Sequence, residues 1–154
     1  MKNIGAESQL SEYNRLYKEN TAIYHSVCTG LGMPESTFWI LYTLRSEELP
    51  VTQSDMCAIL GYPKQTVNSA LKKLEQEGLL TLSGERGRGG KPIRLTQAGV
   101  KLAETTIDPV IEAEQKALLD LSADEQAQML RLMRRYNDAL NLYFSAIEQE
   151  KTHE

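Results

Sequence analysis

The sequence is poor in cysteine and in long apolar runs, and each absence excludes a class of protein. Its two cysteines, Cys28 and Cys57, are too few for a disulfide framework. No run approaches the roughly 18 apolar residues of a membrane span. The first residues carry no hydrophobic segment typical of a secretory signal. We therefore expect a cytoplasmic globular protein, with its 154 residues in one domain.

The residue arrangements of common catalytic and cofactor sites are also missing. No Ser-His-Asp, Cys-His-Asn or paired-carboxylate arrangement stands out, so no enzyme activity is expected. His25 and Cys28 have the i, i+3 spacing of metal ligands, but the other histidine, His153, lies in the C-terminal tail. Residues 90–92 read Gly-Lys-Pro, whereas a P-loop needs Gly-Lys followed by Ser or Thr. We expect no metal and no cofactor.

What the sequence does contain is the pattern of a winged helix-turn-helix. Two short helices joined by a tight turn, the second polar on one face and followed by a basic hairpin, are typical of proteins that bind duplex DNA. The expected segments are a helix over 52–60, a turn at Gly61-Tyr62-Pro63, a helix over 64–76 that ends before Gly78, and a hairpin whose strands, 79–82 and 93–96, flank residues 83–92.

The charge distribution supports this interpretation although the net charge does not. The chain carries a formal charge of −4, but residues 64–101 hold eight basic against three acidic side chains, a local charge of +5 that leaves −9 for the rest. Binding to DNA requires local neutralisation of phosphates rather than a basic protein as a whole. The basic segment coincides with the second motif helix and the hairpin.

Longer helices are expected on both sides of the motif. Thr52 with Asp55, and Ser122 with Glu125, have the spacing of capping boxes, with Asp replacing Glu in the first. Apolar periodicity predicts a helix over 7–31, a buried helix that Ser36 or Thr37 caps, and a last helix from Ser122. It also predicts a helix from Thr96 to about Leu119, with a kink or a brief break at Asp108-Pro109.

The first and last helices carry more apolar surface than one small lobe can cover. The stripe of the last helix comprises Met129, Leu132, Met133, Tyr136, Leu140, Tyr143 and Ile147. An internal core remains an alternative, but we favour a dimer formed by the two ends. The expected fold is mainly α with a small β-hairpin wing: a DNA-binding lobe over 35–100, with dimerisation helices over 7–31 and 101–148.

The polar face of the second motif helix and the basic hairpin supply the expected DNA contacts. Side-chain amides such as Gln65 and Asn68 can pair with adenine in the major groove, whereas lysines farther along the helix suit phosphates. Arginines at a glycine-rich hairpin tip can enter a minor groove. The expected set is Lys64, Gln65, Thr66, Asn68, Ser69, Lys72, Lys73, Arg86, Arg88, Lys91 and Arg94.

Two further features allow a functional and a structural interpretation. The rings of Tyr13, Tyr17, Tyr24, Trp39 and Tyr42 could line a cleft for an aromatic or lipophilic ligand, although packing in the core or at a dimer interface explains each residue more simply. Cys28 could sense oxidants, but it has no clear resolving partner and a packed thiol is the simpler interpretation.

In order and spacing, these motifs resemble the MarR family of bacterial transcription regulators over residues 8–148. The resemblance rests on Val-Thr-Gln-Ser-Asp-Met-Cys-Ala-Ile-Leu-Gly at 51–61, Gln-Thr-Val at 65–67, Leu-Lys-Lys-Leu-Glu-Gln-Glu-Gly-Leu-Leu at 71–80, Ile-Arg-Leu-Thr-Gln-Ala-Gly at 93–99 and Leu-Ser-Ala-Asp-Glu at 121–125. It implies a homodimer that reads a two-fold symmetric DNA operator, and in many relatives a repressor released by small phenolic or lipophilic ligands. Where the family's wing commonly has an acidic residue followed by paired arginines, this sequence has Glu85-Arg86-Gly87-Arg88.

Two other classes of function remain to be distinguished. A winged helix that binds another protein would show no salt-dependent binding to duplex DNA and would not depend on Arg86 or Arg88. An enzyme with a coincidental winged-helix pattern would need a convergent polar cluster in a cleft, which the sequence does not reveal.

Overall fold

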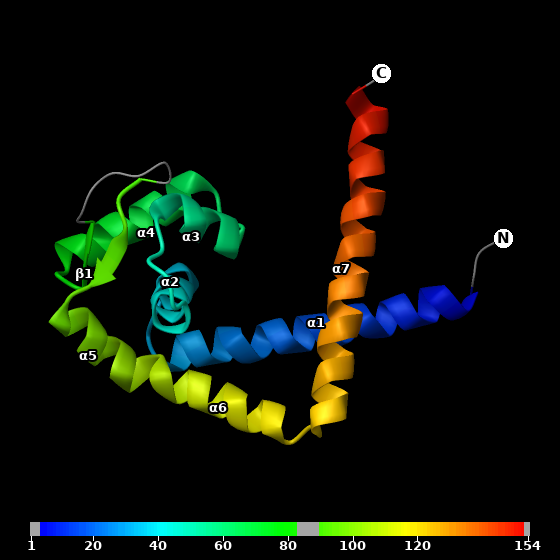
Figure 1. Ribbon diagram of the computed structural model, residues 1–154, viewed down its shortest axis with the longest axis horizontal. Helices are drawn as coiled ribbons and strands as arrows, with labels where there is room; N and C mark the ends of the chain where they lie inside the picture. Colours follow the sequence, from blue (N-terminus) through cyan, green and yellow to red (C-terminus); the bar gives the residue numbers. More distant parts are fainter. Residues whose placement is uncertain (1–3, 83–89, 153–154) are drawn as a thin grey trace. The chain divides into compact units, whose positions relative to one another are not determined.

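The computed structural model describes residues 4–82 and 90–152 and divides into two compact units, Met1–Pro109 and Val110–Glu154. As expected, the described residues are mostly helical with one two-stranded antiparallel hairpin (Figure 1). The elements are α1 (Ile4–Gly30), α2 (Glu35–Ser46), α3 (Gln53–Leu60), α4 (Lys64–Gln76), β1 (Leu80–Leu82), β2 (Ile93–Leu95), α5 (Gln97–Thr106), α6 (Asp108–Leu119) and α7 (Ala123–Thr152).

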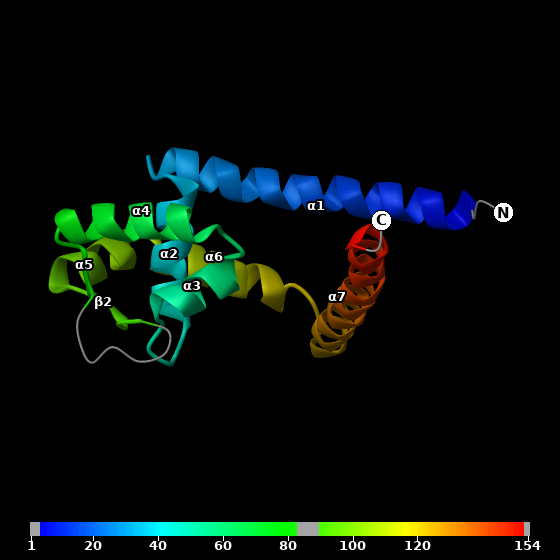
Figure 2. The same ribbon diagram turned by 90° about the horizontal axis from the view of Figure 1, so that it is seen from above.

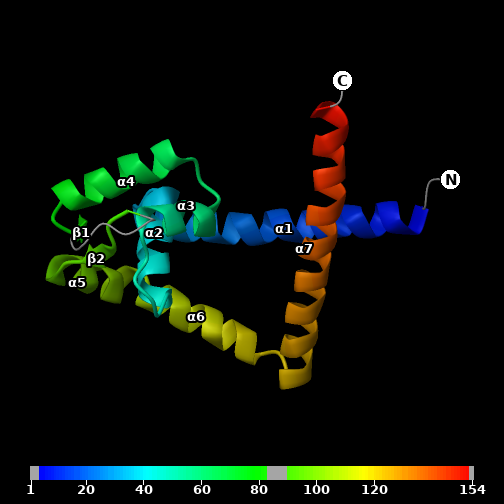
Figure 3. The ribbon, with the colours of Figure 1, turned by 45° about the horizontal axis from the view of Figure 1, so that its top comes forward.

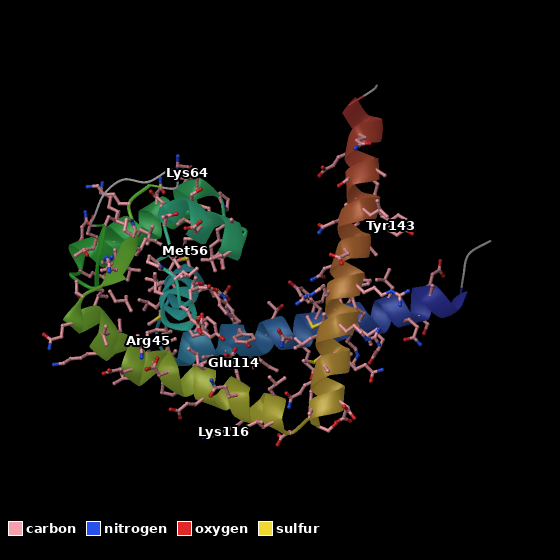
Figure 4. All side chains as sticks on the ribbon, viewed as in Figure 1. Arg45, Met56, Lys64, Glu114, Lys116 and Tyr143 are labelled. Atoms are coloured by element: carbon pink, nitrogen blue, oxygen red, sulfur yellow. The ribbon has the colours of Figure 1, made fainter. Side chains whose placement is uncertain are left out.

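The core of the first unit forms where α2, α3, α4 and the hairpin meet. Met56 on α3 is completely buried, and Figure 4 shows its side chain directed into the space that α2 shares with α3. The cluster around it contains Ile40, Val51, Met56, Val67, Leu71, Leu74, Leu80 and Ile93. As its apolar composition predicts, α2 is the most enclosed helix, with Phe38, Ile40 and Leu41 fully buried.

Local sequence signals explain where most of the helices begin. Thr52 and Asp55 form the predicted capping box: the Asp55 N–H donates to Thr52 Oγ1 at 3.2 Å, and the Thr52 N–H donates to Asp55 Oδ2 at 2.9 Å. The prediction that Ser36 or Thr37 caps α2 is wrong. The helix begins at Glu35, and Pro34 occupies the N-cap with φ −59° and an extended ψ of 141° and with no side-chain cap.

The hairpin is anchored to its neighbours at the end away from its turn. Leu80 pairs with Leu95, and Leu82 pairs with Ile93. Thr96 follows β2, and its N–H donates to the Leu79 carbonyl at 3.0 Å while its hydroxyl donates to the Gly78 carbonyl at 2.6 Å. The same hydroxyl accepts from the Gly99 N–H at 3.1 Å and so caps α5. One side chain therefore ties the end of α4, the hairpin and the start of α5 together.

The predicted break at Asp108-Pro109 is confirmed, since α5 ends at Thr106 and α6 begins at Asp108. Pro109 has no N–H to donate to the carbonyl four residues earlier, so one continuous helix is disfavoured there. Ile107 between the two helices is completely buried, which anchors the break in the first unit.

The second unit contains most of α6, followed by α7. Ser122 and Glu125 make the predicted capping box, with the Ser122 N–H donating to Glu125 Oε2 at 2.8 Å. The side-chain amide of Gln126 donates to the carbonyls of Leu118 and Leu121, which satisfies backbone oxygens at the end of α6.

In the first unit, α1 is one unbroken helix of 27 residues that leads into α2 (Figure 2). Its apolar side chains are largely uncovered, including Leu10, Leu16 and Tyr17. Among the residues the structure describes, no helix combines the length and the apolar character needed to cross a membrane.

Candidate nucleic-acid interface

Helix α4 separates a buried apolar face from an exposed polar one. Val67, Leu71 and Leu74 are buried against the core. The predicted contact residues Lys64, Gln65, Thr66, Ser69, Lys72 and Lys73 are all exposed. Figure 3 shows α4 along the outer edge of the first unit, and Figure 4 shows Lys64 directed away from the core. The exposed polar side chains of α4 are therefore available to a partner as large as a duplex.

The turn before α4 sets the angle at which this helix is presented. Gly61 has φ +63°, a left-handed conformation that glycine adopts without strain, and its N–H donates to the Cys57 carbonyl at 2.9 Å. Pro63 occupies the N-cap, and α4 begins at Lys64 as predicted. The proline has an extended ψ of 142°, so it completes the turn instead of starting the helix.

Asn68 differs from the other predicted contact residues on α4 because its side chain is half-buried and already has a partner. The side-chain amide of Gln53, the first residue of α3, donates to Asn68 Oδ1. Sequence reasoning missed Gln53, since a contact between residues 15 apart on two helices depends on how those helices pack.

The hairpin places further cations beside this surface. Arg94 is exposed on β2 opposite Thr81, and Lys91 is exposed just before the strand. The Ile93 N–H donates to the Val51 carbonyl at 2.8 Å, which joins the base of the hairpin to the segment before α3. Arg86 and Arg88 lie outside the described residues.

An open groove of about 610 Å³ runs beside the exposed face of α4. Its walls are the first turn of α2, with Ser36 and Thr37, and the side chains of Gln65, Ser69 and Lys73 on α4. Lys73 Nζ also lies 4.0 Å from Glu77 Oε1, so the carboxylate of Glu77 partly compensates the charge of Lys73. The polar side chains of this groove carry hydroxyl, amide and ammonium groups, which all donate hydrogen bonds, and Pro34, Pro63 and Ala70 contribute apolar surface.

The five rings proposed for a ligand cleft fall into two groups. Tyr13 and Tyr17 stack on α1 with centroids 6.4 Å apart and remain exposed. The ring centroid of Trp39 lies 5.0 Å from that of Tyr24 and 5.4 Å from that of Tyr42. Only the second group joins α1 to α2, and its rings are half-buried.

Cys28 and its surroundings favour a packed thiol. The side chain is 2% exposed, and burial, followed by the nearby Glu35 carboxylate, raises the pKa of the thiol. A protonated thiol is a poor nucleophile. His25 instead pairs with Glu35, with Nδ1 2.7 Å from Oε1. In the described part of the chain, no cluster of three or more His, Cys, Asp or Glu side chains could hold a metal ion.

A second unpredicted contact joins the end of α2 to the start of α6. The Arg45 guanidinium donates through Nε to Asp108 Oδ1 at 2.8 Å and through Nη2 to Asp108 Oδ2, a bidentate pair in which both side chains are 29% exposed. The hydrogen bonds from Arg45 lower the pKa of the Asp108 carboxyl, and those to Asp108 raise the pKa of Arg45. Figure 4 shows Arg45 beside the first turn of α6.

Comparison with known proteins connects this architecture to a family of regulators. The sequence profile described as the MarR family matches residues 31–89. A search of curated protein sequences finds no significant match. Among solved structures, a MarR family regulator of Neisseria meningitidis, NMB1585, is similar with a TM-score of 0.78 and 21% identity, over 89% of this chain and 96% of that one.

The similar structures include relatives solved with bound molecules. Staphylococcus aureus MepR, in a complex with DNA, has a TM-score of 0.68 and 24% identity, over 83% of this chain and 96% of its own. S. aureus MarR, in complex with salicylate and kanamycin, has a TM-score of 0.67 and 17% identity, over 90% of this chain and 93% of its own. At these identities the likeness establishes the fold. The resemblance drawn from the sequence is supported: residues 31–89 match the profile of the MarR family, and the chain has the fold of the solved MarR-family regulators.

Proposed function

We propose that this chain is a homodimeric, sequence-specific DNA-binding transcription regulator. The observation that carries the proposal is the exposed polar face of α4, supported by the cations Lys91 and Arg94 of the adjoining hairpin. In helix-turn-helix proteins, side chains from the first part of the second helix contact base edges. The fold shared with MepR, which is solved in complex with DNA, supports the same function.

Each residue of the interface is assigned a role by its position. Gln65, Thr66 and Ser69 lie on the first half of α4 and contact bases, with Lys64 beside them at the helix start. Lys72 and Lys73 lie on the second half and contact phosphates, as do Lys91 and Arg94. Arg86 and Arg88 are assigned to the minor groove or the DNA backbone from the sequence alone.

The proposed dimer covers the apolar faces of α1, α6 and α7. On α7, Met133 is 57% exposed and Tyr143 is 67% exposed, and both lie on the predicted stripe. Large apolar side chains exposed along two long helices are typical of an interface between subunits. Two copies related by a two-fold axis would present two α4 helices to a pseudo-palindromic operator, with half-sites about 10 base pairs apart.

The finer part of the proposal is that the protein is a repressor released by a small ligand. The contacts of Trp39 with Tyr24 and Tyr42, at the junction of α1 and α2, support an aromatic or lipophilic effector bound there. S. aureus MarR, which shares the fold, is solved in complex with salicylate and kanamycin. The dimer could hold its two DNA-binding lobes at different separations. Such a ligand can release DNA only if it binds more tightly to the dimer at a separation that does not fit the operator.

Selection of bound fragments from random duplex DNA tests the function directly. We expect a two-fold symmetric site whose affinity falls steeply with salt. Gln65→Ala should reduce discrimination between sites by about 1–3 kcal/mol, whereas Lys72→Ala should weaken all duplexes alike and flatten the salt dependence. Absence of any salt-dependent duplex binding would leave the protein-binding winged helix as the better explanation.

The dimer is tested separately by light scattering on two neighbouring variants of α7. Met133→Glu places a charge on the apolar stripe and should yield monomers. Arg134→Glu changes the adjacent residue, which faces away from the stripe, and should remain dimeric. Deletion of residues 137–154 should also yield monomers; a stable dimer after that deletion contradicts the assignment of the interface.

A further inference from the structure

The break between α5 and α6 lies where the first unit of the chain ends and the second begins. The first unit ends at Pro109 and the second starts at Val110, so α6 begins in one unit and continues in the other. At the end of α5, the Ile107 N–H donates to the Ala103 carbonyl at 2.8 Å. Pro109 has no N–H to donate, so the ladder of backbone hydrogen bonds is interrupted where α6 leaves the first unit.

Two side chains hold this break against the first unit. Ile107 is completely buried, which fixes the position of the backbone. Asp108, the first residue of α6, accepts two hydrogen bonds from the Arg45 guanidinium, from Nε to Oδ1 at 2.8 Å and from Nη2 to Oδ2. Because the guanidinium and the carboxylate are both planar, a bidentate pair restrains the orientation of the two groups as well as their distance. The pair therefore restrains the direction of the first turn of α6.

Arg45 lies on a helix that packs directly against α4. It is in the last turn of α2, and the side chain of Ile40 on the same helix is completely buried. Ile40 shares one apolar cluster with Val67 and Leu71, which belong to the buried face of α4. Closely packed elements transmit displacement to one another, so the orientation of α4 follows that of α2. The contact of Arg45 with Asp108 thus connects the helix proposed to read DNA with the helix that leads into the second unit.

The spacing of half-sites is the property on which such a restraint should act. A dimer reads a two-fold symmetric operator only when both α4 helices reach their half-sites together. If each lobe turns freely at its break, only a fraction of the dimers presents the two helices at the right separation, and the apparent affinity falls by that fraction. A single half-site imposes no such condition, because one lobe reaches it in any orientation.

We propose that Arg45 and Asp108 are positioning residues that hold the DNA-binding lobe in one orientation on the start of α6, and so determine the half-site spacing that the dimer selects. The proposal rests on the proposed function and deepens it, because it assigns operator spacing to two residues that contact no base. Neither residue lies on α4, α1 or α7. Weakening the pair should therefore leave the base contacts and the dimer intact.

Arg45→Lys and Asp108→Asn weaken the pair in different ways. Lysine keeps the positive charge but cannot form the planar bidentate contact, so the general attraction of the protein for DNA is unchanged. Asparagine removes the carboxylate charge. The hydrogen bonds to Asp108 raise the pKa of Arg45 most, and the charge of Glu104 raises it further. Glu104 therefore lies near the guanidinium and remains there in Asp108→Asn, so that variant does not leave an isolated cation and should fold.

Both variants should lose affinity for the operator and not for its half. We expect the operator with the preferred spacing to bind about fivefold more weakly, and a duplex with one half-site to bind as before. Operators with one base pair more or fewer between the half-sites should lose less, so the preference for one spacing becomes shallower. The double variant should match the single variants in spacing preference, because all three lose the same contact.

Asp124→Asn is the matched control for the change in charge. Asp124, like Asp108, lies in the first turn of a helix, so the substitution removes the same charge from the same local setting. Its carboxylate is exposed and has no ion-pair partner within the part of the chain that the structure describes. Removing a negative charge raises the affinity for every duplex, so Asp108→Asn is compared with this control. Asp124→Asn should keep the spacing preference of the wild type.

The measurement is selection from random duplexes with the full-length dimer, followed by titration of the selected operator with base pairs inserted or removed between its half-sites. A duplex with one half-site is titrated in parallel, and light scattering reports whether each variant remains dimeric. An unchanged spacing preference in both variants overturns the inference while the proposed function stands. An equal loss of affinity for operator and half-site, or a monomeric variant, also overturns it. Failure of the wild-type dimer to bind any duplex overturns both.

Discussion

Gly99 on α5 is a position where a single methyl group should destabilise the protein strongly. A Cβ added there would lie 1.9 Å from the Leu79 carbonyl oxygen and 3.2 Å from Cδ2 of Leu95. Carbon atoms do not approach a backbone oxygen much closer than about 3 Å, so the Leu79 carbonyl would have to move by about 1 Å. That carbonyl accepts the Thr96 N–H at 3.0 Å, and the movement would weaken this bond.

The loss of stability expected for Gly99→Ala follows from these contacts. Overpacking against backbone costs about 1–3 kcal/mol, and a weakened backbone hydrogen bond adds about 1 kcal/mol. The higher helix propensity of alanine offsets this loss of stability by up to about 1 kcal/mol. We therefore expect Gly99→Ala to lower the free energy of unfolding by about 1–3 kcal/mol, measured by urea denaturation with far-UV circular dichroism at a matched protein concentration.

Gly30, the last residue of α1, is the control for this prediction. A Cβ added there meets no atom within 4 Å, and its φ is not positive. Gly30→Ala should leave stability unchanged or raise it by up to about 1 kcal/mol. If Gly99→Ala unfolds at the same urea concentration as Gly30→Ala, the packing of α5 against Leu79 described above is incorrect.

Three further outcomes are expected. Asp108→Asn should cost about 1 kcal/mol at neutral pH, but the difference from wild type should vanish in acid: Arg45 lowers the pKa of the folded carboxyl, so its stabilisation is present above the ordinary aspartate pKa of 3.8 and is lost as pH falls through the lowered value. A difference that persists in acid would contradict the pairing. Thr52→Ala should destabilise by about 1 kcal/mol in urea titrations through loss of the α3 cap, and no change would show that the cap is dispensable. Iodoacetamide should modify Cys57 before Cys28 in the native protein, as followed by peptide mass spectrometry, because Cys28 is buried and its thiol pKa is raised; the reverse order would contradict that burial.

Features encoded within a few residues were predictable from the sequence. The capping boxes at Thr52 and Ser122 depend on contacts three residues apart, and both form as predicted. The interruption at Asp108-Pro109 follows from a missing backbone donor. The start of α2 shows the limit of such signals, because Ser36 and Thr37 suit a cap equally well in sequence, whereas Pro34 occupies the N-cap and both residues lie within the helix.

Contacts between distant segments were not predictable, because they depend on the packing of whole elements. The Arg45–Asp108 pair joins residues 63 apart, and neither charge stands out among the other charges of the chain. The exposed face of α4 was predictable, since its polar residues follow one side of a helix. The contact between Gln53 and Asn68 was not predictable, because it joins residues 15 apart on two different helices.

The attachment of Thr96 to Gly78 and Leu79 bears on how the wing can evolve. In an ordinary hairpin the length and type of the turn decide how the strands align, so an insertion there slides one strand against the other. Here the alignment is decided where the strands leave the helices, through the hydroxyl and the N–H of a single threonine. The residues between the strands are therefore not needed to set the alignment, and substitutions, insertions or deletions there should leave Leu80 and Ile93 in the core.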